Sequence, residues 1–203
     1  MPQAHYFSNE PIGEFRPKTI EVTLAGKKVS VQTAGGIFSP DHVDTGTAVL
    51  LELLDEAPKL GDVLDIGCGW GPIALSIALA RPHVTVWAVD VNERALELTR
   101  MNAALLGVTN IKICKPEEVP ASLKFAGIWS NPPIRVGKEA LHEILKTWLP
   151  RLLSGAESYL VVQKNLGAES LLRWLQDTLP KKFNCLKVDN SKQFRVIRVT
   201  HKN

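Results

Sequence analysis

"DVLDIGCGWGPIALSIALA", residues 62–80, is the stretch that decides the fold. It opens with a short apolar segment over 62–66, passes through a turn that contains Gly67, Gly69 and Gly71, and ends in an apolar segment over 72–80. The first segment has the length of a buried strand. The last has the length of a helix, and Pro72 suits a first helical turn. A strand joined to a helix by a glycine-rich turn is typical of an α/β domain.

The same alternation of strand and helix continues around this stretch. Segments that predict strands lie at 84–89, 110–114, 126–130, 158–163 and 193–199. Segments with helical spacing lie at 43–57, 92–107, 138–153 and 167–179. Strands joined by crossover helices form a mostly parallel sheet with helices on both faces. We therefore expect an α/β fold whose ligands bind beyond the carboxyl ends of the strands.

A different pattern precedes this alternation. Apolar side chains recur at every second position on either side of Ala25-Gly26, at Ile20, Val22, Leu24, Val29 and Val31. This spacing predicts a β-hairpin packed against the main body. We accordingly divide the chain into an N-terminal extension that carries the hairpin, residues 1–40, and a main domain, residues 41–203.

The composition is that of an ordinary globular protein. The chain has 203 residues, of which 45% are hydrophobic and 22% are charged, with a net charge of +3. These values exclude a disordered or fibrous chain. No apolar run approaches the roughly 20 residues that span a bilayer. Cys68, Cys114 and Cys185 are widely separated and show no metal-ligand spacing, so we expect reduced thiols, no metal site and a cytoplasmic protein without membrane contact.

Positive charge gathers near the C-terminus. Between residues 181 and 203 the only acid is Asp189, and the basic residues are Lys181, Lys182, Lys187, Lys192, Arg195, Arg198 and Lys202. Such a segment can contact the phosphates of a nucleic acid. It is equally well explained as a sheet edge protected by solvated Lys and Arg side chains.

The glycine turn favours a ligand that carries positive charge. Gly67, Gly69 and Gly71 alternate, and Asp65 precedes the first of them, which differs from the dinucleotide pattern G-x-G-x-x-G. The carboxylate would repel a pyrophosphate and attract an ammonium or sulfonium group. Asp90 ends the next strand, where an acid can accept hydrogen bonds from both hydroxyls of a ribose. The alternatives are a tight turn without a ligand and an Asp90 that only caps the following helix, although Asn92 is also available as a cap.

These motifs, together with Asn131-Pro132-Pro133-Ile134, resemble class I S-adenosylmethionine-dependent methyltransferases. That family carries D-x-G-x-G-x-G after its first strand and an acid after its second. With "HYFSNEP", "GIFSPDHVDTGT", "AVDVNERALEL" and "VVQKNLGA" added, the chain is most similar to short, single-domain members of the ribosomal RNA small subunit methyltransferase C family, which are guanine-N2 enzymes. The resemblance covers nearly the whole chain. It implies a Rossmann-like, doubly wound sheet of seven mostly parallel strands, and S-adenosyl-L-methionine as cofactor.

The Asn131-Pro132-Pro133-Ile134 loop suits methyl transfer to a planar nitrogen. An exocyclic amine is a poor nucleophile because its lone pair is delocalised into the ring. Two acceptors placed on its protons, the Asn131 side-chain oxygen and the Pro132 carbonyl, favour the reactive form and stabilise the developing positive charge. The prolines fix the backbone and Ile134 offers an apolar face to the base. Taken alone, two prolines after a strand can also simply end the strand.

The resemblance implies further site residues. The expected cofactor-binding residues are Asp44, Gly46, Thr47, Asp65, Gly67, Cys68, Gly69, Gly71, Asp90, Val91, Glu117 and Asn131. Members of the family usually have an acid after the third strand that contacts the adenine. Here that segment reads "CKPEEVP", which does not show the usual pattern, so Glu117 is assigned to the adenine only by its place after this strand. Asp44 can equally be a helix N-cap. Arg135, Lys138 and Lys164 are expected to bind RNA, or to remain solvated.

The expected function is transfer of a methyl group to the exocyclic N2 of a guanine in 16S ribosomal RNA. The partner would be this RNA or the small ribosomal subunit, and the chain is either a monomer or a weak dimer. Adenine N6 and a protein glutamine amide present a similar planar nitrogen, so both remain alternatives. A third alternative is a cofactor-binding RNA module without activity. Longer members of the family carry a second, degenerate copy of the domain, which these residues do not include.

Overall fold

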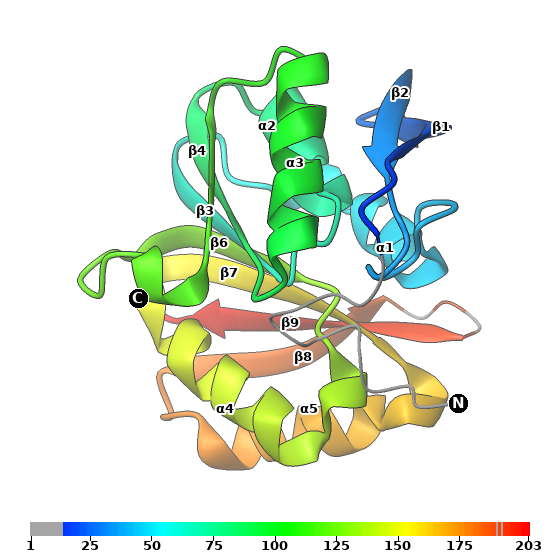
Figure 1. Ribbon diagram of the computed structural model, residues 1–203. Helices are drawn as coiled ribbons and strands as arrows, with labels where there is room; N and C mark the ends of the chain where they lie inside the picture. The colour runs from blue at the N-terminus through cyan, green and yellow to red at the C-terminus, as the bar shows by residue number, and fades with distance from the viewer. Residues whose placement is uncertain (1–13, 190, 192) are drawn as a thin grey trace.

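The structure is a computed structural model, and it describes residues 14–189, 191 and 193–203. Its centre is a seven-stranded sheet in the order β5-β4-β3-β6-β7-β9-β8 (Figure 1). The strands are β3 (Gly61–Ile66), β4 (Val84–Val89), β5 (Ile111–Cys114), β6 (Phe125–Ser130), β7 (Leu152–Gln163), β8 (Phe183–Asp189) and β9 (Phe194–His201). Neighbours from β5 to β7 pair in parallel, whereas β9 pairs antiparallel with both β7 and β8. The predicted mostly parallel sheet of seven strands is confirmed.

Helices cover both faces of this sheet (Figure 1). They are α1 (Thr45–Leu51), α2 (Pro72–Ala80), α3 (Glu93–Leu105), α4 (Lys138–Trp148) and α5 (Ala168–Thr178). Alternate residues of β4 point to opposite faces: Val86 packs in the cluster under α1 and α2, and Trp87 packs in the cluster under α4 and α5. Because both faces are covered, β3 and β4 are almost entirely buried. The expected two-faced α/β architecture is confirmed.

Short 3₁₀ turns complete the connections, and three predictions need correction. The turns are η1 (Leu54–Glu56), η2 (Pro116–Glu118), η3 (Ile134–Val136), η4 (Leu149–Arg151) and η5 (Lys164–Leu166). The helix predicted over 43–57 is shorter: α1 ends at Leu51, η1 follows, and Ala57 is extended because it precedes Pro58. The helix predicted over 138–153 ends at Trp148, because Pro150 has no N–H to continue it, and β7 already begins at Leu152. The edge strand β8 was not predicted individually. Its buried Phe183 and Cys185 alternate with exposed polar and apolar residues, which weakens the strand pattern.

The predicted hairpin is also confirmed. β1 (Lys18–Leu24) and β2 (Lys27–Thr33) form a separate antiparallel sheet, and Ala25 and Gly26 both have positive φ at the turn. Leu24 and Val31 are fully buried in a cluster with residues of α2 and α3. The boundary that we drew at residue 40 stays a prediction. None of the helices in the described ranges is long and apolar enough to cross a membrane.

One buried side chain ties the hairpin to the glycine turn. Asn102 of α3 accepts a hydrogen bond from the Gln32 backbone N–H at 2.6 Å. Its amide nitrogen donates to the Gln32 carbonyl at 2.9 Å and to the Trp70 carbonyl at 3.0 Å. Asn102 and Trp70 are buried, so the Trp70 carbonyl has no water as a substitute partner, whereas Gln32 is half-buried.

We predict that Asn102→Ala lowers the free energy of unfolding by about 2–3 kcal/mol, because it leaves the buried Trp70 carbonyl and two backbone groups of the half-buried Gln32 without their partner. Urea unfolding measures the change. Asn184→Ala removes an exposed asparagine of β8 and is the matched control. A loss no larger than that of the control would show that the hairpin is not held by Asn102.

Candidate active site

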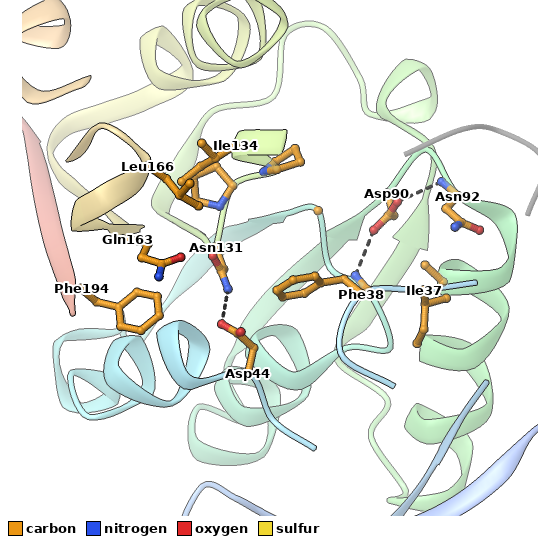
Figure 2. Close-up of a pocket in the computed structure, with 15 residues that line it drawn as sticks. Ile37, Phe38, Asp44, Asp90, Asn92, Asn131, Ile134, Gln163, Leu166 and Phe194 are labelled. Carbon is orange, nitrogen blue, oxygen red and sulfur yellow. Dashed lines mark hydrogen bonds between the residues drawn. The ribbon is translucent and has the colours of Figure 1, made fainter. Parts of the chain in front are cut away.

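A cavity opens at the carboxyl ends of the parallel strands, as expected for this fold (Figure 2). Its volume is about 140 Å³. Its lining residues are Ile37, Phe38, Asp44, Gly67, Gly69, Asp90, Asn92, Ala95, Asn131, Pro132, Pro133, Ile134, Gln163, Leu166 and Phe194. In Figure 2, Asp90 lies at one end and Leu166 and Phe194 at the other, with Asn131 and Asp44 between them. The three predicted motifs therefore meet in one cavity.

The glycine turn forms part of the wall with its backbone. Gly67 and Gly69 have φ angles of +75° and +59°, which side chains rarely allow. Within the described ranges, a Cβ on Gly69 would have no atom within 4 Å, and one on Gly67 would only touch Pro133 at 3.8 Å. The space above these residues is thus open to a ligand. Gly71 differs, because a Cβ there would lie 2.9 Å from the Leu75 side chain, so its role is internal packing at the start of α2.

The end of β4 holds this turn in place. The Gly67 and Cys68 N–H groups both donate to the Val89 carbonyl, at 2.8 and 3.0 Å. The Gly69 N–H donates to Asp90 Oδ2 at 3.0 Å, and the Asn92 N–H donates to Asp90 Oδ1 at 2.9 Å. Burial raises the pKa of Asp90, against the lowering effect of these backbone hydrogen bonds.

The cap of α3 is Asn92 and not Asp90. The Asn92 side chain accepts from the Arg94 N–H at 3.0 Å. The Asp90 carboxylate faces the cavity, and each of its oxygens keeps a lone pair for a further donor. The alternative in which Asp90 only caps the helix therefore loses its support.

Asp65 lies beneath the turn and not in the lining. Its side chain is fully buried, and Oδ2 accepts from the Ala74 N–H in the first turn of α2 at 3.0 Å. Oδ1 has no hydrogen-bond partner within the described part of the chain. Burial raises the pKa of Asp65 to about 8, and the Ala74 hydrogen bond only partly opposes this. Asp65 thus positions the turn through its hydrogen bond to α2, and its raised pKa keeps the carboxyl largely protonated near pH 7.

The Asn131 loop extends from the end of β6 into the cavity. The Asn131 amide nitrogen donates to Asp44 Oδ2 at 2.8 Å and to Thr47 Oγ1 at 3.1 Å (Figure 2). The Pro132 carbonyl accepts from the Ile134 N–H at 2.8 Å across Pro133, which closes a tight three-residue turn. This bond fixes the carbonyl and leaves its second lone pair available. All four residues of the predicted loop line the cavity.

Asp44 combines the two roles that the sequence left open. Its Oδ2 accepts from the Gly46 and Thr47 N–H groups, at 2.8 and 3.2 Å, so Asp44 is the N-cap of α1. It also lines the cavity. Gly46 lies outside the lining and packs on Phe194, whose ring would be 2.8 Å from a Cβ at position 46.

Several lining residues were missed by the sequence analysis. Phe38, Gln163, Leu166 and Phe194 line the cavity without having been named. Gln163 ends β7 and is paired with Phe194, the first residue of β9. Their position at strand ends on the ligand-binding edge was the available signal. Together with Ile134, Leu166 and Phe194 make one end of the cavity apolar.

Other predicted residues lie away from this lining. Glu117 and Val91 are exposed, and neither is among the lining residues. Cys68 is buried and lines a smaller neighbouring pocket. Lys138 begins α4 and Lys164 directly follows Gln163, both outside the lining. The Arg135 side chain lies outside the described part of the structure.

The charge of the cavity has one sign. The lining contains two carboxylates, Asp44 and Asp90, and no Lys, Arg or His among its described residues. Asp65 lies below the same turn. Such a site favours a cationic ligand and disfavours a phosphate.

The comparisons with known proteins agree with this geometry. The family described as methyltransferase small domain matches residues 28–198. The protein named "Uncharacterized protein YbxB" of Bacillus subtilis (strain 168) is 37% identical over 176 residues, covering 85% of this chain and 88% of that protein. The ribosomal RNA small subunit methyltransferase C of Pseudomonas putida (strain GB-1) is 31% identical over 185 residues, covering 89% of this chain and 54% of that protein.

A solved structure has the same fold. It is the T. thermophilus 16S rRNA N2 G1207 methyltransferase in complex with AdoMet and guanosine, with a TM-score of 0.76 and 23% identity, covering 96% of this chain and 52% of that chain. The chain therefore spans about half the length of the methyltransferase C proteins that it matches.

We predict that Asp65→Asn changes the pH dependence of stability. The folded-state pKa of Asp65, about 8, lies above its ordinary value of 3.8, so ionisation of this buried carboxyl costs the native state stability as the pH rises between these values. The variant cannot ionise. Its free energy of unfolding relative to wild type should increase with pH in that window, on the order of 1.4 kcal/mol per pH unit.

Urea unfolding between about pH 5 and pH 8 measures this difference. Asp177→Asn removes an exposed carboxyl of α5 and is the control. Parallel stability curves for wild type and Asp65→Asn would contradict the raised pKa.

Proposed function

We propose a specific reaction for this chain, which belongs to the methyltransferase small domain family. In this proposal the chain transfers a methyl group to the exocyclic N2 of a guanine in 16S ribosomal RNA. Its cofactor is S-adenosyl-L-methionine. The observation that carries the proposal is the Asn131-Pro132 pair of acceptors, held by hydrogen bonds in a cavity lined by carboxylates. A ribosomal RNA substrate would place the enzyme in the cytoplasm.

The residues present fit this cofactor. S-adenosylmethionine supplies an electrophilic methyl carbon on a positively charged sulfur. A cavity with two lining carboxylates, and no cation among the lining residues that the structure describes, suits that charge. Asp90 would accept from the ribose hydroxyls, the open backbone at Gly67 and Gly69 would allow close approach, and Asp44 would lie nearest the methionine part. Ile37, which lies on the Asp90 side in Figure 2, and Ala95 line the cavity, so both are better placed than Glu117 to contact the adenine.

The other end of the cavity suits a planar base. Ile134, Leu166 and Phe194 would contact the faces of the base, and Asn131 would lie at its edge. The Asn131 and Pro132 oxygens would accept the two amine protons and stabilise positive charge as it develops on nitrogen. Among the described residues, none that line the cavity is a histidine or lysine that could act as a base. This reaction needs none during methyl transfer, because the methylated nitrogen becomes acidic and then loses its proton readily.

A basic rim next to the base end supports an RNA substrate. We give this name to Lys164, Lys187 and Arg195. Lys164 and Arg195 are the chain neighbours of the lining residues Gln163 and Phe194. Desolvation, and then the charges of Arg195 and Lys187, lower the pKa of Lys164.

One acid partly balances this rim. Glu169 lies 3.4 Å from Arg195 and 3.8 Å from Lys187. Because this one carboxylate faces three cationic side chains, the rim keeps a net positive charge. It would attract the phosphates of nucleotides that flank an unstacked base. Of the two explanations of the basic C-terminal segment, the rim favours phosphate binding for Lys187 and Arg195. The same segment also forms the edge strand β8.

Two substitutions separate cofactor binding from catalysis. Asp90→Ala should weaken S-adenosylmethionine binding by at least about tenfold, because the ribose hydroxyls lose a charged acceptor. Asn131→Ala should keep cofactor affinity within about threefold and lower kcat by about 100-fold or more, as for removal of one preorganised transition-state partner. Calorimetry measures the first and release of labelled methyl the second. Unchanged affinity in Asp90→Ala, or full turnover in Asn131→Ala, would refute the assigned roles.

The substrate is tested by offering small ribosomal subunits, naked 16S RNA, DNA and release-factor protein in parallel, with nucleoside analysis of the product. We expect label in N2-methylguanosine from ribosomal RNA. Label confined to DNA, or to a glutamine amide of protein, would replace the RNA assignment by one of the two alternatives. Cofactor binding without any transfer would support the inactive module.

The basic rim makes a separate prediction. Lys164→Ala combined with Lys187→Ala should lower RNA affinity about tenfold at moderate salt, and the slope of log affinity against log salt should fall by about one unit for each phosphate that is no longer bound. The control is Lys59→Ala combined with Lys181→Ala. These two exposed lysines precede β3 and β8, and so lie at the end of the strands that is far from the cavity. Equal effects of the two pairs on binding and on salt slope would show that the rim does not bind RNA specifically.

A further inference from the structure

We propose that Asp44 and Thr47 are positioning residues that lock the Asn131 amide with its oxygen toward the substrate. The inference rests on the proposed function, since it concerns the acceptor that activates the amine. It assigns the lock to a helix N-terminus that is 87 residues away from Asn131 in the sequence.

An asparagine side chain has two orientations of nearly equal shape but opposite chemistry. With Oδ1 toward the cavity it accepts a proton of the substrate amine. With Nδ2 toward the cavity, the side chain presents N–H donors to a substrate amine that also carries two N–H donors. If Nδ2 donated to the amine nitrogen, that hydrogen bond would occupy the lone pair that must attack the methyl group. Only the first orientation increases the reactivity of nitrogen, so the choice between them decides turnover.

The contacts of Asn131 select the first orientation. Nδ2 has two hydrogens, and its two acceptors are Asp44 Oδ2 at 2.8 Å and Thr47 Oγ1 at 3.1 Å. A carboxylate can only accept, so a flipped amide would place Oδ1 against Asp44 Oδ2 and create repulsion. The Thr47 hydroxyl can donate or accept and is less strict. Asp44 therefore sets the orientation and Thr47 completes it.

Asp44 is itself held firmly. The Gly46 and Thr47 N–H groups donate to the same oxygen that receives the Asn131 amide, and these bonds start α1. Thr47 is buried, and Gly46 packs against the Phe194 ring. Three N–H groups, from Gly46, Thr47 and Asn131, therefore donate to this one oxygen and fix its position.

Steady-state kinetics distinguishes this lock from cofactor binding by Asp44. Asp44→Ser keeps an N-cap but is too short to reach Asn131. We expect kcat to fall about 30-fold or more at saturating cofactor and RNA, because the amide spends most of its time in the wrong orientation. If Asp44 acts only in cofactor binding, kcat recovers at saturation and the KM for cofactor rises instead, which overturns the proposal.

Thr47 gives a matched pair of variants. Thr47→Val removes the hydroxyl and keeps the shape, and should lower kcat by about threefold to tenfold. Thr47→Ser restores the hydroxyl and should recover most of that loss. Thr45→Val, at an exposed position in the same turn, serves as the control. An equal loss in the serine and valine variants would show that packing, and not the hydroxyl, matters.

A double-mutant cycle tests whether both residues act through Asn131. In the Asn131→Ala background, Asp44→Ser should cause no further loss of kcat, because there is no amide left to orient. If the fold-loss of kcat in the double variant equals the product of the two single fold-losses, Asp44 acts on the reaction independently of Asn131. That result would contradict the lock.

The lock can also be observed without cofactor or substrate. The side-chain NH₂ signals of Asn131, identified by their absence in Asn131→Ala, should be resolved and slow to exchange with water in the free protein. Asp44→Ser should make them exchange at the rate of exposed amides. Unaltered signals in Asp44→Ser overturn the lock, whereas failure of wild type to methylate any RNA overturns the proposed function and leaves this readout unaffected.

Discussion

The glycine turn after β3 is held in a left-handed conformation by the end of β4, and the cavity depends on this constraint. The Val89 carbonyl receives two N–H groups of the turn and the Asp90 carboxylate receives a third. Because Asp90 also binds the Asn92 N–H, the same side chain joins the turn to the start of α3. The backbone wall and the acid that faces the cavity therefore form one unit. A change in the end of β4 would displace both.

The electrostatics divide the site into two zones of opposite sign. Inside, the lining carboxylates Asp44 and Asp90 give a negative cavity, and burial raises the pKa values of Asp90 and of the underlying Asp65. Such burial of carboxyl groups costs stability, and a cationic ligand offsets part of that cost. Outside, the basic rim is positive despite Glu169. This arrangement suits a positively charged methyl donor within and a polyanion at the mouth.

Much of the site follows from short-range sequence rules. The 62–80 stretch, the Asn92 cap and the Asn131 to Ile134 loop depend on residues a few positions apart, and all three lie where these rules placed them. The hairpin likewise follows from period-two spacing around Ala25-Gly26. Edge strand β8 escaped individual prediction because it is covered less completely than the central strands. The shortened α1 escaped because the helical spacing of the apolar residues continues past Leu51, where the helix ends.

What the sequence by itself determined was the fold class, the order of the glycine turn, Asp90 and the Asn131 loop along the chain, and the residues of that loop, because turn and strand propensities are local. Only the tertiary structure decided which groups meet. Sheet register pairs Gln163 with Phe194 at the base end, and Asp65 turns under the glycine turn to bind α2. Asp44 reaches Asn131 because α1 packs on β7 and β9, and β7 is the sheet neighbour of β6, which ends just before Asn131. Such contacts join distant segments, and no local pattern encodes them.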